Sequence, residues 1–224
     1  DTNFVFLGLN PGLQKIMNLE SFENLDNPTV LNNGHDFYHH QNQLLNFIKS
    51  GRQWVGEDFI SVNPRIFNIR LKDLITSIPV KIDYSAGVRS NVGVSANIME
   101  LFVNDVLIRS IAYPAISPIY YNDYARYNDQ SFNVIFTNEQ ISFSNKYAQP
   151  NNTSAAWLHK FTFNYAKNWV YRNEPLWISN VDFYGNNNNF LYQIQAENPK
   201  DLILFEISNF YQTKKVEINL LANQ

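Results

Sequence analysis

Short runs of alternating apolar and polar residues fill most of the chain from about Val88 to Leu220, and brief turns rich in Asn, Asp, Gly and Pro separate them. Successive side chains of a strand point to opposite faces of a sheet, so an alternating run places its apolar residues on one buried face. Many short strands at intervals of about 8–12 residues are typical of a sandwich or a barrel. The sequence therefore predicts an all-β protein, an antiparallel β-sandwich or jelly roll.

Two stretches have the form of a β-hairpin. In the first, Asn138-Glu139 separates the alternating runs 132–137 and 140–144. A short polar turn between two such runs is the usual signature of antiparallel neighbours. We therefore expect these two runs to pair. The apolar residues that we expect on their shared face are Phe132, Val134, Phe136, Ile141 and Phe143.

The second hairpin turns at Asn104-Asp105, between residues 99–103 and 106–110. Asn and Asp tolerate the positive φ angles that tight hairpin turns require. Further short strands are predicted at 4–9, 161–165, 169–171, 176–183, 190–196, 202–207 and 215–220.

A different period precedes these strands and predicts one amphipathic helix over residues 35–50. Four apolar residues there fall at i, i+7, i+8 and i+11, namely Phe37, Leu44, Leu45 and Ile48. Asn33 is placed to cap the start of this helix and Gly51 to end it. Residues 68–77 form a second, shorter helix candidate. We expect a mixed segment at 1–80 and an antiparallel β domain at 81–224, or one continuous domain.

Composition excludes several classes of function. The chain has 224 residues and no cysteine, so disulfides, thiol nucleophiles and cysteine-bound metals are absent. Its formal net charge is −3 and its basic residues are scattered, whereas a nucleic-acid-binding protein shows a basic stripe. No apolar run approaches the roughly 20 residues that span a bilayer. We therefore expect no nucleic acid partner and no membrane span. The first residues carry neither Met nor a basic region, which suggests a processed chain. The location of the protein is left open, with a virion or the extracellular space favoured.

No motif indicates a catalytic or cofactor site. The chain lacks a Gly-x-Ser-x-Gly elbow and a phosphate-binding glycine loop. His35 and His39, or Asp36 and His40, would face the same way on a helix, but zinc needs three or four ligands and His159 is remote. We therefore expect no metal, no cofactor and no enzymatic activity.

A short amino-terminal stretch resembles one enzyme family. Residues 4–12 (Phe-Val-Phe-Leu-Gly-Leu-Asn-Pro-Gly) resemble the strand-then-GLNPG segment of the uracil-DNA glycosylase superfamily, and residues 39–42 (His-His-Gln-Asn) resemble its His-Pro-x-Asn stretch at a helix start. Residues 113–118 resemble its Pro-Ser-x-Ser-Pro loop. The resemblance implies that Asn10 positions a catalytic water or a flipped base. It covers a small part of the chain, and the last hundred residues have an antiparallel β pattern where that family alternates strands and helices.

Aromatic residues are the remaining candidates for a functional surface. The segment 113–128 is irregular, contains two prolines and carries a cluster of four tyrosines at 120–127, too many to bury comfortably. Aromatic side chains combine a large apolar area with a polar edge, which suits protein interfaces, and they also stack on sugar rings. The predicted partner-binding residues are Tyr120, Tyr121, Tyr124, Tyr127, Trp157 and Trp177.

These observations favour a non-enzymatic structural or interaction protein. We expect it to assemble with itself or with other proteins, as a virion or phage capsid or tail component. The first alternative is a carbohydrate-binding module or lectin-like adhesin with glycan partners. The second is an enzyme that resembles uracil-DNA glycosylases.

Overall fold

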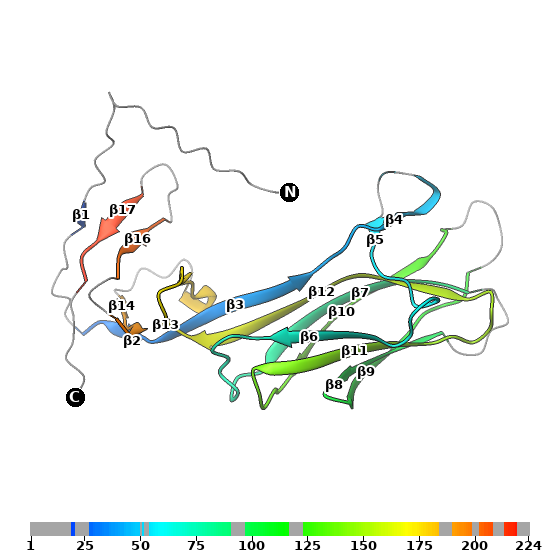
Figure 1. The fold of residues 1–224 in the computed structure, drawn as a ribbon, viewed down its shortest axis with the longest axis horizontal. Coiled ribbons are helices and arrows are strands. Elements are labelled where there is room, and N and C mark those ends of the chain that lie inside the picture. The colour runs from blue at the N-terminus through cyan, green and yellow to red at the C-terminus, as the bar shows by residue number, and fades with distance from the viewer. Residues whose placement is uncertain are drawn as a thin grey trace, which may run out of the picture.

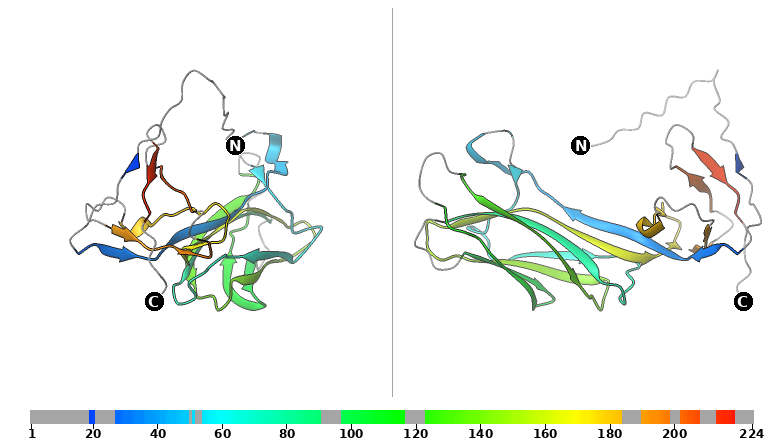
Figure 2. Two further views of the ribbon diagram at one scale, coloured as in Figure 1. Left: turned by 60° about the vertical axis from the view of Figure 1, so that its left-hand side comes forward. Right: turned by 180° about the vertical axis from the view of Figure 1, so that it is seen from behind.

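The computed structural model describes residues 19–20, 27–49, 51, 54–90, 97–116, 123–183, 190–198, 202–207 and 213–218. Its centre consists of two four-stranded antiparallel sheets that face each other, and a group of shorter strands lies at one end of the elongated molecule (Figures 1 and 2). Within the described residues there is no α-helix, only the 3-10 turns η1 (Phe47–Lys49) and η2 (Val181–Phe183). The all-β prediction is confirmed.

Strands from the two predicted segments, 1–80 and 81–224, share both sheets. The first sheet has the order β10-β7-β12-β3 and the second the order β6-β11-β8-β9. The strands of the first sheet are β3 (Asn33–His40), β7 (Val80–Arg89), β10 (Arg126–Val134) and β12 (Ala155–Asn168). Those of the second are β6 (Arg65–Arg70), β8 (Ile98–Val103), β9 (Val106–Ala112) and β11 (Gln140–Ala148).

The core lies between the two sheets and is rich in aromatic rings. Phe161 and Phe163 of β12 point inward, and the ring of Phe143 from β11 meets them at centroid distances of 4.9 and 5.1 Å. All three side chains are fully buried, and so are Ile82 and Tyr84 on β7. Burying a large apolar side chain stabilises the fold by about 1.5–3 kcal/mol, so these layers hold the sheets together.

The hairpin predicted at Asn104-Asp105 is confirmed. β8 and β9 pair antiparallel with Val103 opposite Val106, and φ is 48° at Asn104 and 65° at Asp105. Both turn residues therefore adopt the left-handed conformation for which their side chains are suited.

The hairpin predicted at Asn138-Glu139 is wrong. β10 pairs with β7, whereas β11 pairs with β6 and β8, so the two strands lie in different sheets. The prediction of their apolar faces was correct, because Phe136, Ile141 and Phe143 are buried in the core. The alternation of apolar and polar residues identifies the buried face of a strand, but it does not determine which other strand it pairs with. Here the turn carries the chain from one sheet to the other.

The helix predicted over residues 35–50 is also wrong. Its first half is strand β3, which pairs with β12 from Asn33 opposite Asn168 to His40 opposite Phe161. The helical spacing was accidental, since Phe37 is 65% exposed and lies on no buried stripe. The second predicted helix, 68–77, is the end of β6 followed by turns. Eight residues of ladder hydrogen bonds with β12 outweigh a weak helical pattern.

Shorter strands complete the described chain. They are β1 (Leu19–Glu20), β2 (Thr29–Leu31), β4 (Leu45–Asn46), β5 (Trp54–Val55), β13 (Val170–Tyr171), β14 (Phe190–Tyr192), β15 (Gln195–Ala196), β16 (Leu204–Glu206) and β17 (Lys214–Val216). Strands therefore occur within the predicted ranges 161–165, 169–171, 190–196, 202–207 and 215–220. The range 176–183 contains no strand, and the predicted strand at 4–9 lies outside the described residues.

The carboxy-terminal segment is fastened to the end of the two sheets by backbone and ionic contacts. The N–H of His35 on β3 donates to the carbonyl of Ser179 (2.9 Å). Arg172 donates two hydrogen bonds, of 2.7 and 2.6 Å, to the carboxylate of Asp73. A bidentate pair of this kind fixes orientation as well as distance.

Candidate functional site

A small hairpin interrupts one edge of the first sheet. After His40 the chain leaves β3, forms β4, η1 and β5, and returns at Gly56. The N–H of Gly56 then donates to the carbonyl of Leu158 on β12 (2.7 Å), and the N–H of Phe59 donates to the carbonyl of Ala156 (2.9 Å). Figure 1 shows this β4–β5 hairpin standing out from the sheet beside the end of β12. The hairpin is therefore an insertion between β3 and residues 56–59, which both lie along the edge of β12.

The base of the hairpin is held by a carboxylate. Oε1 of Glu57 lies 3.0 Å from Nε2 of His40 and accepts a 2.6 Å hydrogen bond from the side-chain amide of Asn42. The His40 ring stacks on Phe161 at 5.0 Å and contacts Phe67 at 4.7 Å. These contacts join the outgoing and returning chains, so the hairpin leaves the sheet at a fixed point.

The underside of the hairpin is buried against the outer face of the first sheet. Phe47 is 4% exposed and Val55 is fully buried, and they form a second small core with Ala155 and Trp157. The Phe47 ring lies 4.7 Å from Trp157 in an edge-to-face contact and 4.9 Å from Tyr124. Edge-to-face pairs add about 0.5–1.5 kcal/mol beyond area burial. The hairpin is therefore an anchored element.

Gly87 makes room for this second core. It lies on the central strand β7, opposite Tyr127 of β10 and Trp157 of β12. A Cβ at Gly87 would lie 3.2 Å from two ring atoms of Tyr127, a tight contact that would require the ring to shift by a few tenths of an ångström. The Tyr127 hydroxyl is buried without a hydrogen-bond partner, and burial raises the pKa of Tyr127 to about 12.

His159 and Ser85 lie next to these rings. Nδ1 of His159 is 3.2 Å from the Ser85 hydroxyl, and its ring meets Tyr127 edge-on at 5.7 Å. Desolvation, helped by the charge of Lys160, lowers the pKa of His159, so its neutral form is favoured. Ser85 is buried under the neighbouring side chains. The pair therefore supports the sheet surface and does not present a nucleophile to a substrate.

The hairpin and its surroundings also expose large apolar side chains. Leu44, Leu45 and Trp54 are 66%, 43% and 40% exposed, and the neighbouring Tyr124 is 39% exposed. We call these four residues the hairpin patch. The guanidinium of Arg89 lies 4.2 Å from the centroid of the Tyr124 ring, a cation–π contact that fixes this ring at the rim. Apolar and aromatic side chains with an arginine beside them are the composition that protein interfaces favour.

The structure brings three of the sequence-predicted residues together. Tyr124, Tyr127 and Trp157 belong to this end of the molecule, where Tyr124 is exposed and Trp157 is buried beneath the hairpin. Trp177 is exposed on the segment between β13 and η2, and β13 lies at the other end of β12 from the hairpin (Figure 1). Tyr120 and Tyr121 lie outside the described residues. None of these observations tests partner binding, so the assignment stays a prediction.

Sequence reasoning missed Phe47, Trp54 and Arg89. The helix predicted over residues 35–50 concealed the hairpin, because it assigned Phe37 and Leu44 to one buried stripe. A signal was present in Gly51, which adopts a φ of 72° and whose N–H donates to the side-chain oxygen of Asn46 (3.0 Å). A glycine between two short apolar runs also indicates a hairpin loop.

The histidines do not form a metal site. His35 and His39 share one face of β3 and His40 lies on the other, since β3 is a strand. His39 contacts the Thr162 hydroxyl (2.8 Å), and His40 contacts Glu57. In the described part of the chain no three His, Asp or Glu side chains gather in a way that would hold a metal ion.

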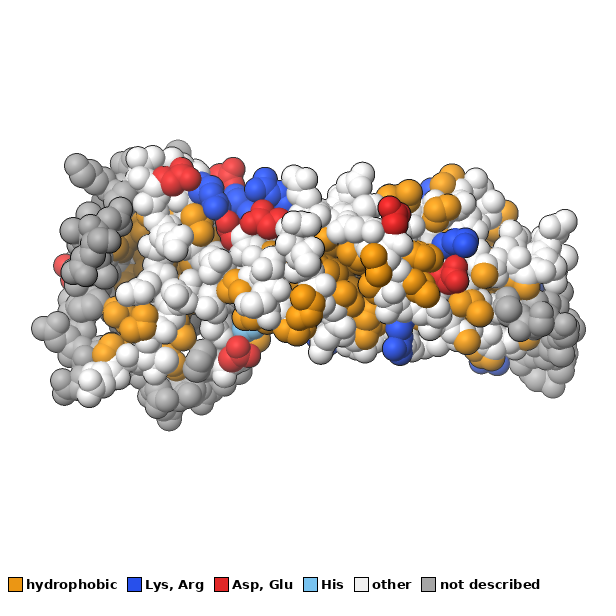
Figure 3. Space-filling view, turned by 90° about the horizontal axis from the view of Figure 1, so that it is seen from below, with side chains coloured by type: hydrophobic (Ala, Val, Ile, Leu, Met, Phe, Trp, Pro, Cys, Tyr) orange, Lys and Arg blue, Asp and Glu red, His pale blue; other side chains and the backbone are white. Residues whose placement is uncertain are grey.

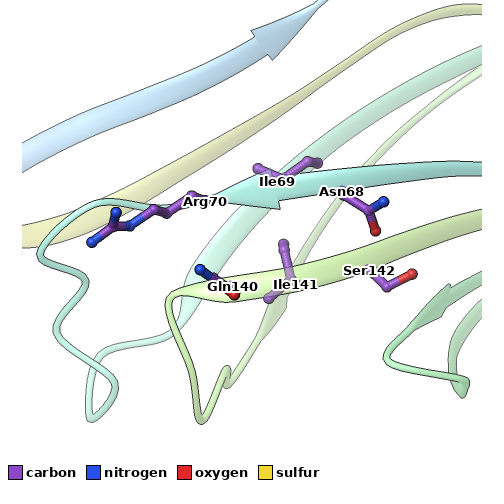
Figure 4. Close-up of a pocket in the computed structure, with 6 residues that line it drawn as sticks. All are labelled: Asn68, Ile69, Arg70, Gln140, Ile141 and Ser142. Atoms are coloured by element: carbon purple, nitrogen blue, oxygen red, sulfur yellow. The ribbon is translucent and has the colours of Figure 1, made fainter.

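Two surface depressions are open and shallow. One, of about 420 Å³, lies between the neighbouring strands β6 and β11 (Figure 4). Its lining residues are Asn68, Ile69, Arg70, Gln140, Ile141 and Ser142. Arg70 is the charged member and is engaged by Glu139 at 3.3 Å. This set contains no acid, base and nucleophile in one place, so it does not indicate catalysis.

The enzyme resemblance gains nothing from the described residues. Residues 39–42 lie at and after the end of strand β3, and not at the start of a helix. Asn10 lies outside the described residues. Across the described ranges, no helix has the length and apolar character needed to cross a bilayer.

Comparisons with known proteins identify the fold. No family model matches the chain, and no curated protein matches it. Among solved structures, 92% of the chain is similar to 20% of the chain in the dimeric latent PorU from Porphyromonas gingivalis, with a TM-score of 0.71 and 17% identity. At that identity the likeness shows a shared fold, and the chain spans about one fifth of PorU. The carbohydrate-binding module CBM36, solved with calcium and xylotriose, covers 56% of the chain and 87% of its own length with 10% identity and a TM-score of 0.34, too low to carry an argument.

Proposed function

We propose that the chain is a non-enzymatic β interaction module that binds another protein chain through the hairpin patch. The observation that carries this proposal is that the β4–β5 hairpin is anchored by buried residues and still exposes large apolar side chains. Phe47 and Val55 are buried beneath it, whereas Leu44, Leu45 and Trp54 are exposed on it. A surface of large apolar side chains on an anchored support loses little conformational entropy when a partner covers it.

The chemistry of the patch favours a protein partner. Trp, Tyr and Arg are the residues most enriched among those that dominate binding energy in protein interfaces. The hairpin exposes Trp54, and beside the hairpin Arg89 lies on the ring of Tyr124. We expect Tyr124 to be buried in an interface of at least ~1,000 Å² in total. The shared fold with one fifth of PorU supports a module that works as part of a larger assembly.

The alternatives differ in what they require. A glycan-binding module would use Tyr124 and Trp54 as stacking platforms for sugar rings, so sugar binding is a distinct outcome of the same test. The predicted role in a virion has no support from the comparisons and stays a prediction. An enzyme of the glycosylase type would need Asn10, about whose position the structure says nothing.

Affinity capture with a matched pair of variants tests the proposal. The wild-type chain and a Leu44→Ser, Trp54→Ser variant are immobilised, and proteins retained from extracts of the source cells are compared. Proteins retained only by the wild type are then purified and titrated. We expect at least a tenfold loss of affinity in the variant and no loss in the control Val181→Ser, which removes an exposed apolar side chain elsewhere.

A second arm of the experiment separates the alternatives. Both proteins are applied to a glycan array. Reproducible sugar binding that the double variant loses, without any protein partner, would replace the proposal by the lectin alternative. Equal capture by the wild type and the double variant would also refute it.

A further inference from the structure

The outer face of the second sheet carries a regular pattern of side-chain size and charge that is separate from the hairpin patch. Its two central strands, β11 and β8, are antiparallel neighbours, and the residues that alternate with their buried positions point outward. Figure 3 views this side of the molecule and shows hydrophobic side chains gathered in its middle. The outward residues are Ser144, Lys146 and Ala148 on β11 and Phe102, Glu100 and Ile98 on β8.

The outward residues form three rows with opposite members. Ser144 lies opposite Phe102 and Ala148 lies opposite Ile98, so each of these rows joins a small side chain on β11 to a large one on β8. In the row between them, Lys146 lies opposite Glu100, and Nζ is 3.4 Å from Oε2. One strand therefore presents small, positive and small side chains, and its neighbour presents large, negative and large ones.

The row of Ser144 and Phe102 continues to both edges of the sheet. Ile66 of β6 lies opposite Ser144, and Leu107 of β9 lies opposite Phe102. Both edge side chains are at least half exposed. This row is thus an exposed apolar band across four strands, interrupted only at the small residue Ser144.

We propose that a second copy of this chain packs on this face, related by a two-fold axis that runs parallel to the strands between β11 and β8. Such an axis places β11 of one copy over β8 of the other, in the aligned arrangement common between packed sheets. Phe102 then fits the space over Ser144 of the second copy, and Lys146 faces Glu100 of the second copy. Ile66 and Leu107, at the two edges, also meet across the axis.

The complementarity selects a second copy over an unrelated partner. An isologous interface must match itself after a two-fold rotation. Both the size pattern and the charge pattern of β11 and β8 are inverted across the same line, so each satisfies this condition. Binding of an unrelated partner would not require β11 and β8 to complement each other.

The size of the face sets the expected strength. Four strands about 4.8 Å apart and about six residues long at 3.4 Å each give about 400 Å² per copy. The total of about 800 Å² is below the roughly 1,200–2,000 Å² of stable specific interfaces and in the range of weak, transient ones, so the dimer should depend on protein concentration in the micromolar range or above.

Charge exchange between the two strands tests the proposal. Sedimentation velocity at concentrations from 1 to 500 μM, at low salt, measures the dimer fraction of Lys146→Glu, Glu100→Lys and the double exchange K146E/E100K. In each single variant, like charges face each other across the axis, so we expect dimer affinity to fall by about tenfold or more. The double exchange restores opposite charges and should restore the dimer.

Mixing the two single variants gives a sharper result. The Lys146→Glu protein presents two negative groups and the Glu100→Lys protein two positive ones, so we expect the mixture to form a heterodimer although neither protein dimerises alone. Thermal unfolding confirms that each variant is folded, since Lys146 is about half exposed and the pair within one chain contributes little.

Three outcomes would overturn the proposal. The first is a wild-type chain that stays monomeric up to 500 μM. The second is a dimer whose affinity is unchanged by both single exchanges. The third concerns the hairpin patch. The variant Leu44→Ser, Trp54→Ser should dimerise like the wild type, which separates this face from the hairpin patch; loss of the dimer in that variant would assign self-association to the hairpin and refute the second face.

Discussion

Replacing Phe47 by alanine should release the hairpin from the sheet. The Phe47 side chain is 4% exposed and its ring contacts Trp157 at 4.7 Å and Tyr124 at 4.9 Å. Truncating a buried phenylalanine usually costs about 3–5 kcal/mol, which includes the lost ring contacts and the cavity. The site lies beneath a surface hairpin that can partly collapse into the space. We therefore expect a loss of about 3 kcal/mol in the free energy of unfolding.

Two measurements check this prediction. Urea denaturation gives the change in the free energy of unfolding, and hydrogen exchange reports on the hairpin itself. The N–H of Leu44, which donates to the carbonyl of Val55 (2.9 Å), should exchange much faster in Phe47→Ala. If the hairpin detaches before the sheets unfold, the opening free energy that exchange measures at Leu44 falls by more than the global free energy of unfolding.

The matched control is Phe37→Ala. This phenylalanine is 65% exposed on β3, so its removal should change stability by no more than about 0.5 kcal/mol. A Phe47→Ala loss below about 1 kcal/mol with unchanged Leu44 exchange would show that Phe47 is not the anchor. Equal losses in the two variants would refute the assignment of buried and exposed faces.

Three further predictions follow from the described contacts. Tyr127→Phe removes a buried hydroxyl that has no hydrogen-bond partner, so denaturation should show no loss or a gain of up to about 1 kcal/mol, and a clear loss would show that the hydroxyl does have a partner. Burial lowers the pKa of His159 in the folded state, so its contribution to folding stability is complete above the unfolded pKa of 6.5 and is lost as pH falls through the folded pKa. The free energy of unfolding of the wild type should therefore decline more between pH 7.5 and 5.5 than that of His159→Asn. Parallel curves of stability against pH for the two proteins would disprove this. Asp73→Asn breaks the bidentate contact with Arg172 and should cost about 1 kcal/mol, whereas the exposed Lys72→Met should be silent; equal effects would contradict this account.

The elements that could be predicted from the sequence are those set by residues close together in the chain. Asn104 and Asp105 adopt positive φ in a tight turn by themselves, and the hairpin follows. The burial of Phe136 and Ile141 followed from alternation in the same way. Which strand lies beside another depends on contacts far along the chain, so the pairing of β10 with β7 and of β11 with β6 and β8 was out of reach of that pattern.

The candidate site was predictable only in part. Tyr124 was identified because a tyrosine-dense irregular segment suggests contact with a partner. Phe47 and Trp54 were missed because a helical spacing was assigned to a segment that is a strand followed by a hairpin. That segment is specified by Glu57, which binds Asn42, and by the ladder with β12, and neither contact is visible in a window of neighbouring residues.

Site-specific photo-crosslinking tests the central claim most directly. The photoreactive residue p-benzoylphenylalanine is placed at Trp54 in the hairpin patch or, as a control, at the exposed Phe37 on β3, and each protein is expressed in the source cells and irradiated. The account predicts a discrete crosslink to another protein chain from position 54 that is absent or much weaker from position 37. Equal crosslinking from both positions, or none from position 54, would contradict the claim that the hairpin patch binds a protein partner.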